Sequence, residues 1–188
     1  MKQRTLVIIG CGKSKRDYAC KAGELYTGQL FKLSRQWAEM VGDDWLIASA
    51  RLPDNKPAGG AMPGATCGLI HPEIVIEPYD RTLKGLGYDA IRQWRSWAQA
   101  DFSAWLRDND YPRDRESQAE WAANFRIVIL AGKDYVQPLR ETAMRSFRIE
   151  TPLAGLGIGE RLQWLKGAVE QARQEAQRRE SQLTLFSS

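Results

Sequence analysis

Short apolar runs alternate along the chain with amphipathic stretches and polar turns. Residues 5–9 (Thr-Leu-Val-Ile-Ile) are almost all apolar, most are β-branched, and a glycine follows them. Such a run is typical of a strand that is buried on both faces of a parallel sheet. Residues 44–49 and 125–131 have the same character, and residues 148–151 predict a fourth, weaker strand.

Between these runs, apolar residues recur at helical spacing. This spacing predicts helices over residues 28–41 and 88–108, and further helices over 137–145 and 160–179. Residues 74–76 are expected to form a short extended piece. Residues 108–120 are polar and charged, and they predict a surface excursion without a regular element.

Strands that alternate with helices indicate an α/β protein. We expect a single-domain three-layer αβα sandwich around a roughly four-stranded parallel sheet. Residues 1–179 form this domain, which carries a long loop rich in glycine and proline over residues 51–73. Loops of that length are usually functional or mobile. Residues 180–188 are expected to form a flexible C-terminal peptide.

Composition narrows the class of protein. No apolar run approaches the roughly 20 residues that span a bilayer, and the N-terminal apolar run is too short for a signal peptide, so we expect a cytoplasmic protein without a membrane partner. A net charge of +4 and a pI near 9.0 are compatible with nucleic acid. With one histidine and three cysteines at no ligand spacing, we expect no metal and no cofactor.

The strand ends hold the candidate chemistry. Ligands of open parallel sheets bind beyond the carboxyl ends of the strands, where residues 10–15 (Gly-Cys-Gly-Lys-Ser-Lys) supply glycines and cations. A nucleotide-binding P-loop would need glycine at Val7, and a dinucleotide fingerprint would need it at Lys15. The loop is either an anion-binding segment or a tight turn with solvated lysines.

Three further segments are expected near the same edge. Residues 77–81 (Glu-Pro-Tyr-Asp-Arg) offer Tyr79 for base stacking and Asp80 for stabilising a sugar cation, unless Tyr79 packs in the core and Asp80 caps a turn. Residues 133–135 face substrate or start a helix with Asp134 as its cap. Residues 155–159 either bind phosphate or pack a helix closely against the sheet.

The last residues have the character of an anchor. Their apolar cluster could fill a groove on a partner, and the string 182–186 resembles the short peptide by which bacterial polymerases and repair proteins bind the sliding clamp. The alternative is a tail that folds back on the core. The expected partner-binding residues are Gln182, Leu183, Leu185 and Phe186.

Five motifs carry a family resemblance. CGKSK at 11–15, LYTG at 25–28, EPYD at 77–80, LAGKDY at 130–135 and PLAGLGIG at 152–159 are similar to a bacterial and phage family of small domains. That family is distantly similar to the uracil-DNA glycosylase-like superfamily and to domains that modify 7-deazaguanine. The resemblance implies a base-sized pocket at the strand ends. The chain departs from the pattern by an insertion at 52–66 and by the lack of a histidine motif near the last strand.

The hypothesis that follows is a DNA glycosylase-like hydrolase that excises a modified base, with phage DNA as a target in antiviral defence. Alternatives are a base-modifying transferase that acts on a nucleotide or tRNA base, and a non-catalytic DNA- or clamp-binding module. The expected catalytic residues are Asp80, Lys13 and Lys133. The expected substrate-binding residues are Gly10, Cys11, Gly12, Ser14, Lys15, Tyr26, Tyr79, Asp134, Gly155, Gly157 and Gly159.

Overall fold

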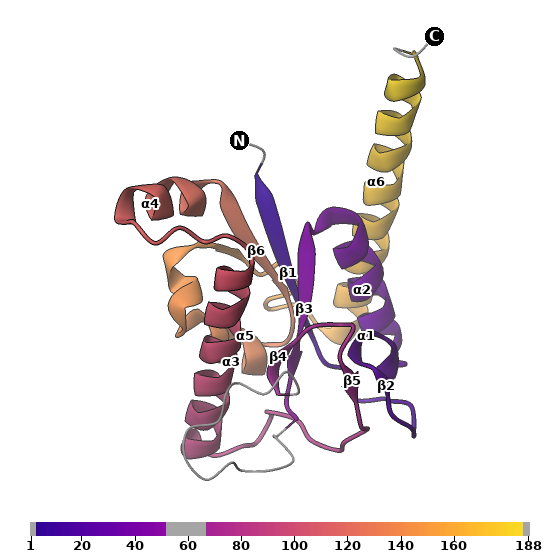
Figure 1. Cartoon of the computed structure of the whole chain (residues 1–188). Coiled ribbons are helices and arrows are strands. Elements are labelled where there is room, and N and C mark those ends of the chain that lie inside the picture. The colour runs from indigo at the N-terminus through magenta and orange to yellow at the C-terminus, as the bar shows by residue number, and fades with distance from the viewer. Residues whose placement is uncertain (1–2, 52–66, 186–188) are drawn as a thin grey trace.

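The computed structural model describes residues 3–51 and 67–185 (Figure 1). The insertion at 52–66 lies outside the described residues. The strands are β1 (Arg4–Gly10), β2 (Cys20–Lys21), β3 (Asp44–Ser49), β4 (Gly68–Ile70), β5 (Val75–Ile76), β6 (Phe125–Leu130) and β7 (Arg148–Glu150). The helices are α1 (Ala22–Leu25), α2 (Gln29–Val41), α3 (Tyr88–Asp108), α4 (Arg115–Ala123), α5 (Lys133–Arg140), the 3₁₀ turn η1 (Ala143–Ser146) and α6 (Ile158–Leu185).

The central sheet has five strands in the order β4-β3-β1-β6-β7. All neighbouring pairs are parallel except β4, which runs antiparallel to β3 at the edge. The four strands predicted from the sequence are therefore the parallel ones. The sequence did not predict β4, because its three residues follow closely on the run of glycines and prolines.

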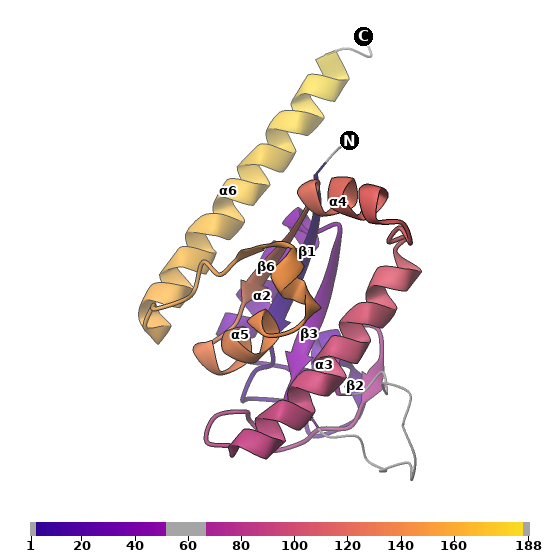
Figure 2. The ribbon, with the colours of Figure 1, turned by 90° about the vertical axis from the view of Figure 1, so that its left-hand side faces the viewer.

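Helices cover both faces of the sheet, as Figure 2 shows with α6 on one side and α3 on the other. The central strand β1 sends Leu6 and Ile8 into one apolar cluster with α3 and α5. It sends Val7 and Ile9 into the other cluster, with α1, α2 and α6. Period-two alternation in a fully apolar strand thus fills two cores at once.

Two expected boundaries were wrong. Part of the excursion expected at 108–120 is helical, since Asp114 accepts the amide hydrogen of Ser117 and starts α4. The helix expected over 137–145 instead begins at Lys133, with Gly132 as its N-cap, and it ends at Arg140 before a short 3₁₀ turn. The proline at position 138 lies inside this helix.

Helix α6 is longer than the sequence indicated. It packs against α2, and Ala172 is its last buried residue. Residues 173–182 are all exposed. In Figure 1 this part of α6 projects beyond the sheet, at the same end of the molecule as the N-terminus. The helix runs on through residues 180–185, where we had expected a flexible peptide. Within the described ranges no helix is apolar enough over sufficient length to cross a membrane.

Candidate functional site at the strand ends

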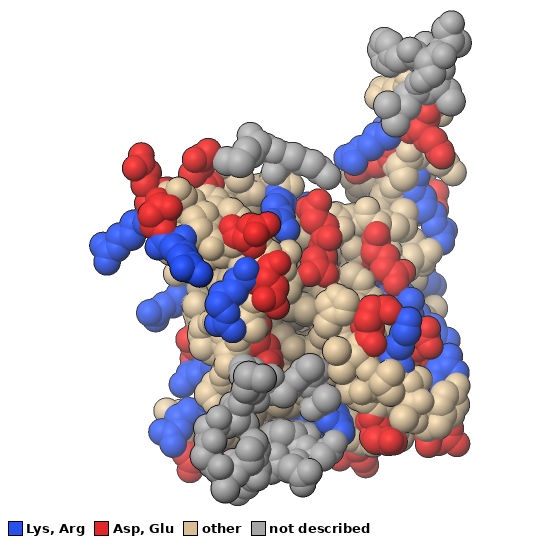
Figure 3. Space-filling view, viewed as in Figure 1, with Lys and Arg blue, Asp and Glu red and all other residues tan. Residues whose placement is uncertain are grey.

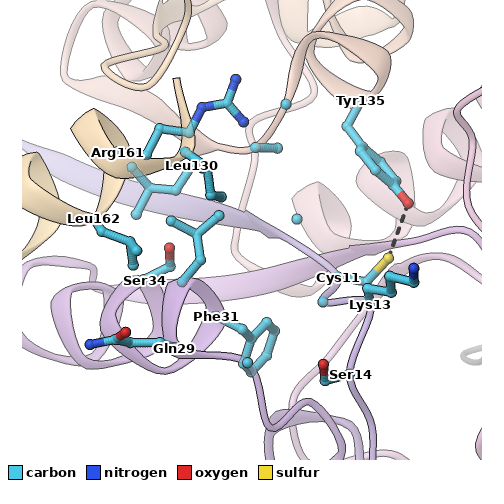
Figure 4. A pocket seen from close by; sticks show the side chains of 17 residues that line it. Cys11, Lys13, Ser14, Gln29, Phe31, Ser34, Leu130, Tyr135, Arg161 and Leu162 are labelled. Carbon is cyan, nitrogen blue, oxygen red and sulfur yellow. Dashed lines mark hydrogen bonds between the residues drawn. The ribbon is translucent and has the colours of Figure 1, made fainter. Parts of the chain in front are cut away.

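Two hollows adjoin at the carboxyl ends of β1 and β6. The first hollow has a volume of about 420 Å³ and lies between β1, α2, α5 and the start of α6 (Figure 4). Its size is within the range of roughly 300–1,000 Å³ that is usual for small-molecule sites. Its walls are Gly10, Cys11, Gly12, Lys13, Ser14, Gly28, Gln29, Leu30, Phe31, Ser34, Leu130, Ala131, Gly132, Tyr135, Ile158, Arg161 and Leu162.

The second hollow has a volume of about 660 Å³ and a different character. Its cations come from the loop after β1 and from the segment before α3, and Asp80 is its acid. It shares four lining residues with the first hollow, so the two are neighbours across the loop that follows β1. Its walls are Cys11, Gly12, Lys13, Lys15, Asp80, Arg81, Thr82, Lys84, Leu86 and Tyr135.

The loop after β1 is held by close backbone packing. A Cβ on Gly10 would lie 3.1 Å from Cβ of Ala131, and one on Gly12 would lie 3.3 Å from Cβ of Tyr26. Glycine at these two positions lets the chain pass between β6 and α2. A bridge between Lys15 and Tyr26 fixes the far end of the loop. The predicted anion-binding or turn segment is thus a structured wall between the two hollows.

Cys11 and Tyr135 form the common edge of the hollows. The Sγ atom of Cys11 lies 3.0 Å from the Tyr135 hydroxyl, at hydrogen-bonding distance (Figure 4). Burial, and after it the neighbouring Cys11, raises the pKa of Tyr135. The phenol therefore stays protonated and can donate to sulfur or to a ligand. The sequence analysis placed 133–135 near substrate, but it selected Lys133 and Asp134. The residue that lines the hollows is Tyr135.

Tyr26 and Tyr79 belong to a buried polar chain. Their hydroxyls lie 2.9 Å apart, and Tyr79 is 2.8 Å from Oγ of Ser49. Burial raises the pKa of both phenols. Tyr26 is only 2% exposed, so the expectation that it contacts substrate is wrong. The alternative that Tyr79 packs in the core accounts for its position, since neither tyrosine lines a hollow.

Lys15 lies across these two rings. Its Nζ is 4.4 Å from the ring centroid of Tyr79 and 5.6 Å from that of Tyr26. Burial lowers the pKa of Lys15, while Cys11 and Asp80 act in the opposite sense. The ammonium therefore covers the Tyr79 ring where a base was expected to stack. Lys15 reaches the second hollow, as the sequence indicated.

Asp80 and Lys13 line the same hollow. Asp80 is exposed, and it accepts no hydrogen bond from any residue within 3–51 and 67–185, so it does not cap a turn. Its neighbours in the wall are the cations Lys15, Arg81 and Lys84. A carboxylate among cations at a concave surface can orient water and stabilise a developing positive charge.

Several expected site residues lie elsewhere. Lys133 is exposed, and neither Lys133 nor Asp134 lines a hollow, because they occupy the outer side of the first turn of α5. Asp134 is the second helical residue, not the cap. The glycines at 155, 157 and 159 also stay outside both walls. The amide hydrogen of Gly157 is already donated to Oε2 of Glu160, at 2.7 Å, so a phosphate would have to displace a carboxylate there.

The sequence missed four lining residues with useful chemistry. Arg81 and Tyr135 lay inside quoted motifs, and their neighbours were chosen instead. Ser34 lies in the helix expected over 28–41 and Arg161 in the helix expected over 160–179, and neither was selected as a site residue. The signal that could have found Arg161 is its position in the first turn of a helix that follows a strand-end loop.

The expected C-terminal anchor begins on the last turns of α6. Gln182 is exposed on α6, Leu183 and Leu185 are helical, and Phe186 lies outside the described residues. In Figure 1 this end of α6 lies at the opposite end of the sheet from the carboxyl end of β1, where the loop that follows this strand lines the two hollows. A partner bound there would leave the hollows open. The clamp interaction stays a prediction.

Charges are mixed over the surface. On the face shown in Figure 3, acidic and basic side chains of the described residues are interspersed, without a continuous basic surface. The described part of the chain also contains no group of three His, Cys, Asp or Glu side chains placed to hold a metal ion. Four cations, Lys13, Lys15, Arg81 and Lys84, line the second hollow.

Comparison with known proteins gives one match. No curated protein matches the chain, and no solved structure matches it. A family model described as a family of unknown function (DUF6884) matches residues 6–53 and 63–167. The match includes both strand-end loops and the walls of both hollows. The chain is a member of this family of unknown function, DUF6884.

Proposed function

We propose that the protein is a hydrolase that cleaves the N-glycosidic bond of a modified base in DNA. One observation carries the proposal. Asp80 and Lys13 line one hollow at the strand ends, and Lys13 also borders the largely apolar hollow beside it. A base and its sugar need such a pair of adjoining spaces, one apolar and one charged.

The base is assigned to the first hollow. Leu30, Phe31, Leu130 and Leu162 supply apolar walls that suit the faces of an aromatic ring. To enter this hollow the nucleotide must leave the base stack, as it does in enzymes that act on single bases in DNA. The base then enters past Cys11, Gly12 and Lys13, which both hollows share.

The sugar and its phosphates are assigned to the second hollow. Lys15, Arg81 and Lys84 provide positive charge there, so binding should weaken as salt rises. The arrangement leaves Asp80 on the sugar side of the glycosidic bond and Lys13 between sugar and base. This division gives each charged group a distinct role.

The reaction follows from these roles. The bond between the anomeric carbon and the base nitrogen breaks, and its electron pair leaves with the base. Lys13 stabilises the developing negative charge on the base, which then takes up a proton. Asp80 stabilises the cationic sugar and orients water. Water adds to the anomeric carbon and releases a proton, so protons balance overall.

The fold supports the same proposal. The parallel strands β3-β1-β6-β7 between helical layers are compatible with a uracil-DNA glycosylase-like sandwich. Phage DNA with modified bases is the target class that we propose, in the cytoplasm and in antiviral defence. No cofactor is required by the chemistry described.

The C-terminal end of α6 is proposed as a sliding-clamp anchor. Deleting residues 182–188 should abolish capture of the protein on immobilised clamp and leave base release from naked oligonucleotides unchanged. Retention of clamp binding after the deletion would contradict the anchor and would leave the hydrolase proposal untouched.

The proposed reaction is tested by incubating the protein with plain and hypermodified DNA and then treating the DNA with alkali. Strand breaks at modified sites that disappear with Asp80→Ala support a glycosylase. A gain in mass of the base would indicate a transferase instead. Reduced gel mobility of DNA without chemical change, equal in Asp80→Asn, would indicate a non-catalytic binding module.

A further inference from the structure

The first hollow has a one-sided electrostatic character. Its walls contain two cationic side chains, Lys13 and Arg161, and no aspartate or glutamate among the described residues that line it. The second hollow, in contrast, balances its cations with Asp80. A neutral base would need no such excess of positive charge in a mostly apolar cavity.

Two helices begin at the first hollow without side-chain caps. Gly28 starts α2 and Gly132 starts α5, and neither helix has a capping side chain for its first amide hydrogens. Both glycines line the cavity. By comparison, Asp114 caps α4, and Glu160 occupies the start of α6. Free amide hydrogens and the helix dipoles of α2 and α5 both favour an anion in the cavity.

Ser34 is an independent sign of a ligand. Its side chain is only 2% exposed and lines the cavity, yet its hydroxyl has no hydrogen-bond partner among the described residues. Figure 4 shows this hydroxyl pointing into the space next to Leu130 and Leu162. A ligand in the cavity can therefore hydrogen-bond this hydroxyl without displacing a partner within the protein.

Arg161 is fixed in place but keeps donors available. Its Nε atom donates to the carbonyl oxygen of Leu156 at 2.8 Å, and its Nη1 lies beside Gly132 at the start of α5. No carboxylate within residues 3–51 and 67–185 forms an ion pair with it. Figure 4 places Arg161 and Ser34 on the side of the cavity away from Cys11 and Lys13.

We infer that the Ser34 and Arg161 side of the first hollow binds a negatively charged group on the ligand, a carboxylate or a phosphoryl group. The apolar walls hold the ring that carries this group. Combined with the proposed function, on which this identification of the ring as a base rests, the substrate is a base with an acidic substituent, and a base with only neutral substituents fits less well.

The test compares two free bases that differ only at one ring position. Isoorotate is a uracil with a carboxylate where thymine has its methyl group. Calorimetric titration of the full chain should show that isoorotate binds at least about tenfold more tightly than thymine, as expected for hydrogen bonds to a charged group. Inorganic phosphate, titrated alone, distinguishes a phosphoryl site from a carboxylate site.

Two variants locate the bound anion, and two others serve as controls. Ser34→Ala and Arg161→Gln should each reduce the preference for isoorotate over thymine roughly fivefold or more. Lys166→Gln removes the same charge from an exposed position on α6 outside both hollows, and it should keep the preference. Ser103→Ala is the matched control for the loss of a helical serine hydroxyl.

The outcomes separate this inference from the proposed function. Equal binding of the two bases, together with no phosphate binding that depends on Ser34 and Arg161, would overturn the anion site even if the protein cleaves DNA. Loss of the preference in Lys84→Gln but not in Arg161→Gln would do so too, because it places the anion in the second hollow. A preserved preference without any base release would refute only the hydrolase.

Discussion

The two hollows share one wall but differ in what surrounds it. The first is bordered by apolar side chains and by two uncapped helix starts, while the second is bordered by three lysines, an arginine and Asp80. The difference arises from topology. Residues of α2 and α6 line the first hollow, whereas the segment before α3 lines the second. One loop, residues 10–15, thereby serves two chemically distinct spaces.

This contrast assigns different tasks to lysines that look alike in the sequence. Lys13 borders both hollows, Lys15 is held over tyrosine rings, and Lys133 borders neither. Position relative to the shared wall, and not charge alone, should decide how much each contributes.

The largest effect is expected from Lys13. Replacing it by alanine should lower the single-turnover rate of base release about 10²–10³-fold, because it removes a charge that stabilises the leaving base. The DNA affinity should fall much less. Lys133→Ala is the matched control and should stay within about twofold of the wild type. A larger loss of rate in Lys133→Ala than in Lys13→Ala would contradict the assignment of leaving-base stabilisation to Lys13.

Asp101 supplies a contrast outside both hollows. It accepts the amide hydrogen of Leu69 at 3.0 Å, and burial raises its pKa from 3.8 to about 7. The folded protein therefore keeps a proton that the unfolded chain releases, and stability falls as pH rises from 3.8 through about 7.

Asp101→Asn should remove this fall. The free energy of unfolding of the wild type relative to the variant should decrease by about 2 kcal/mol between acidic and mildly alkaline pH, as measured by urea denaturation. Asp89→Asn, at an exposed position on the same helix, is the control. A pH-independent difference between wild type and Asp101→Asn would show that Asp101 is ionised throughout.

A smaller effect is expected at the rim of the second hollow. Lys84→Gln should weaken DNA binding about fivefold and reduce the slope of log affinity against log salt by about 1, since one phosphate contact is lost. Fluorescence anisotropy over a salt series measures both. Lys166→Gln should leave the slope unchanged. An unchanged slope in Lys84→Gln would contradict the proposal that the DNA backbone binds in the second hollow.

Much of the fold was predictable from the sequence because it depends on patterns that are local. The apolar side chains at 5–9, 44–49 and 125–131 leave water only if both faces of each strand are buried. Those at 88–108 do so if one face of a helix is buried. The strand β4 could not be predicted, because its pairing with β3 is a long-range contact made by three residues.

The site was predictable in outline and wrong in detail for a geometric reason. Strand order places the ends of β1 and β6 together, so residues 10–15 and 132–135 were expected to meet. Which side chain then points inward depends on where α5 begins. With Gly132 as N-cap, Tyr135 enters both hollows and Lys133 does not. Such a shift of one or two residues is beyond what spacing alone can resolve.

The central claim is that Asp80 acts on a glycosidic bond held between the two hollows. The most direct measurement is mass-spectrometric detection of free base released from modified DNA under single-turnover conditions by the wild type, Asp80→Asn and the exposed control Asp17→Asn. We expect release by the wild type and by Asp17→Asn, and a rate lower by about 10³-fold in Asp80→Asn. Equal release by Asp80→Asn, or no free base from any of them, would contradict it.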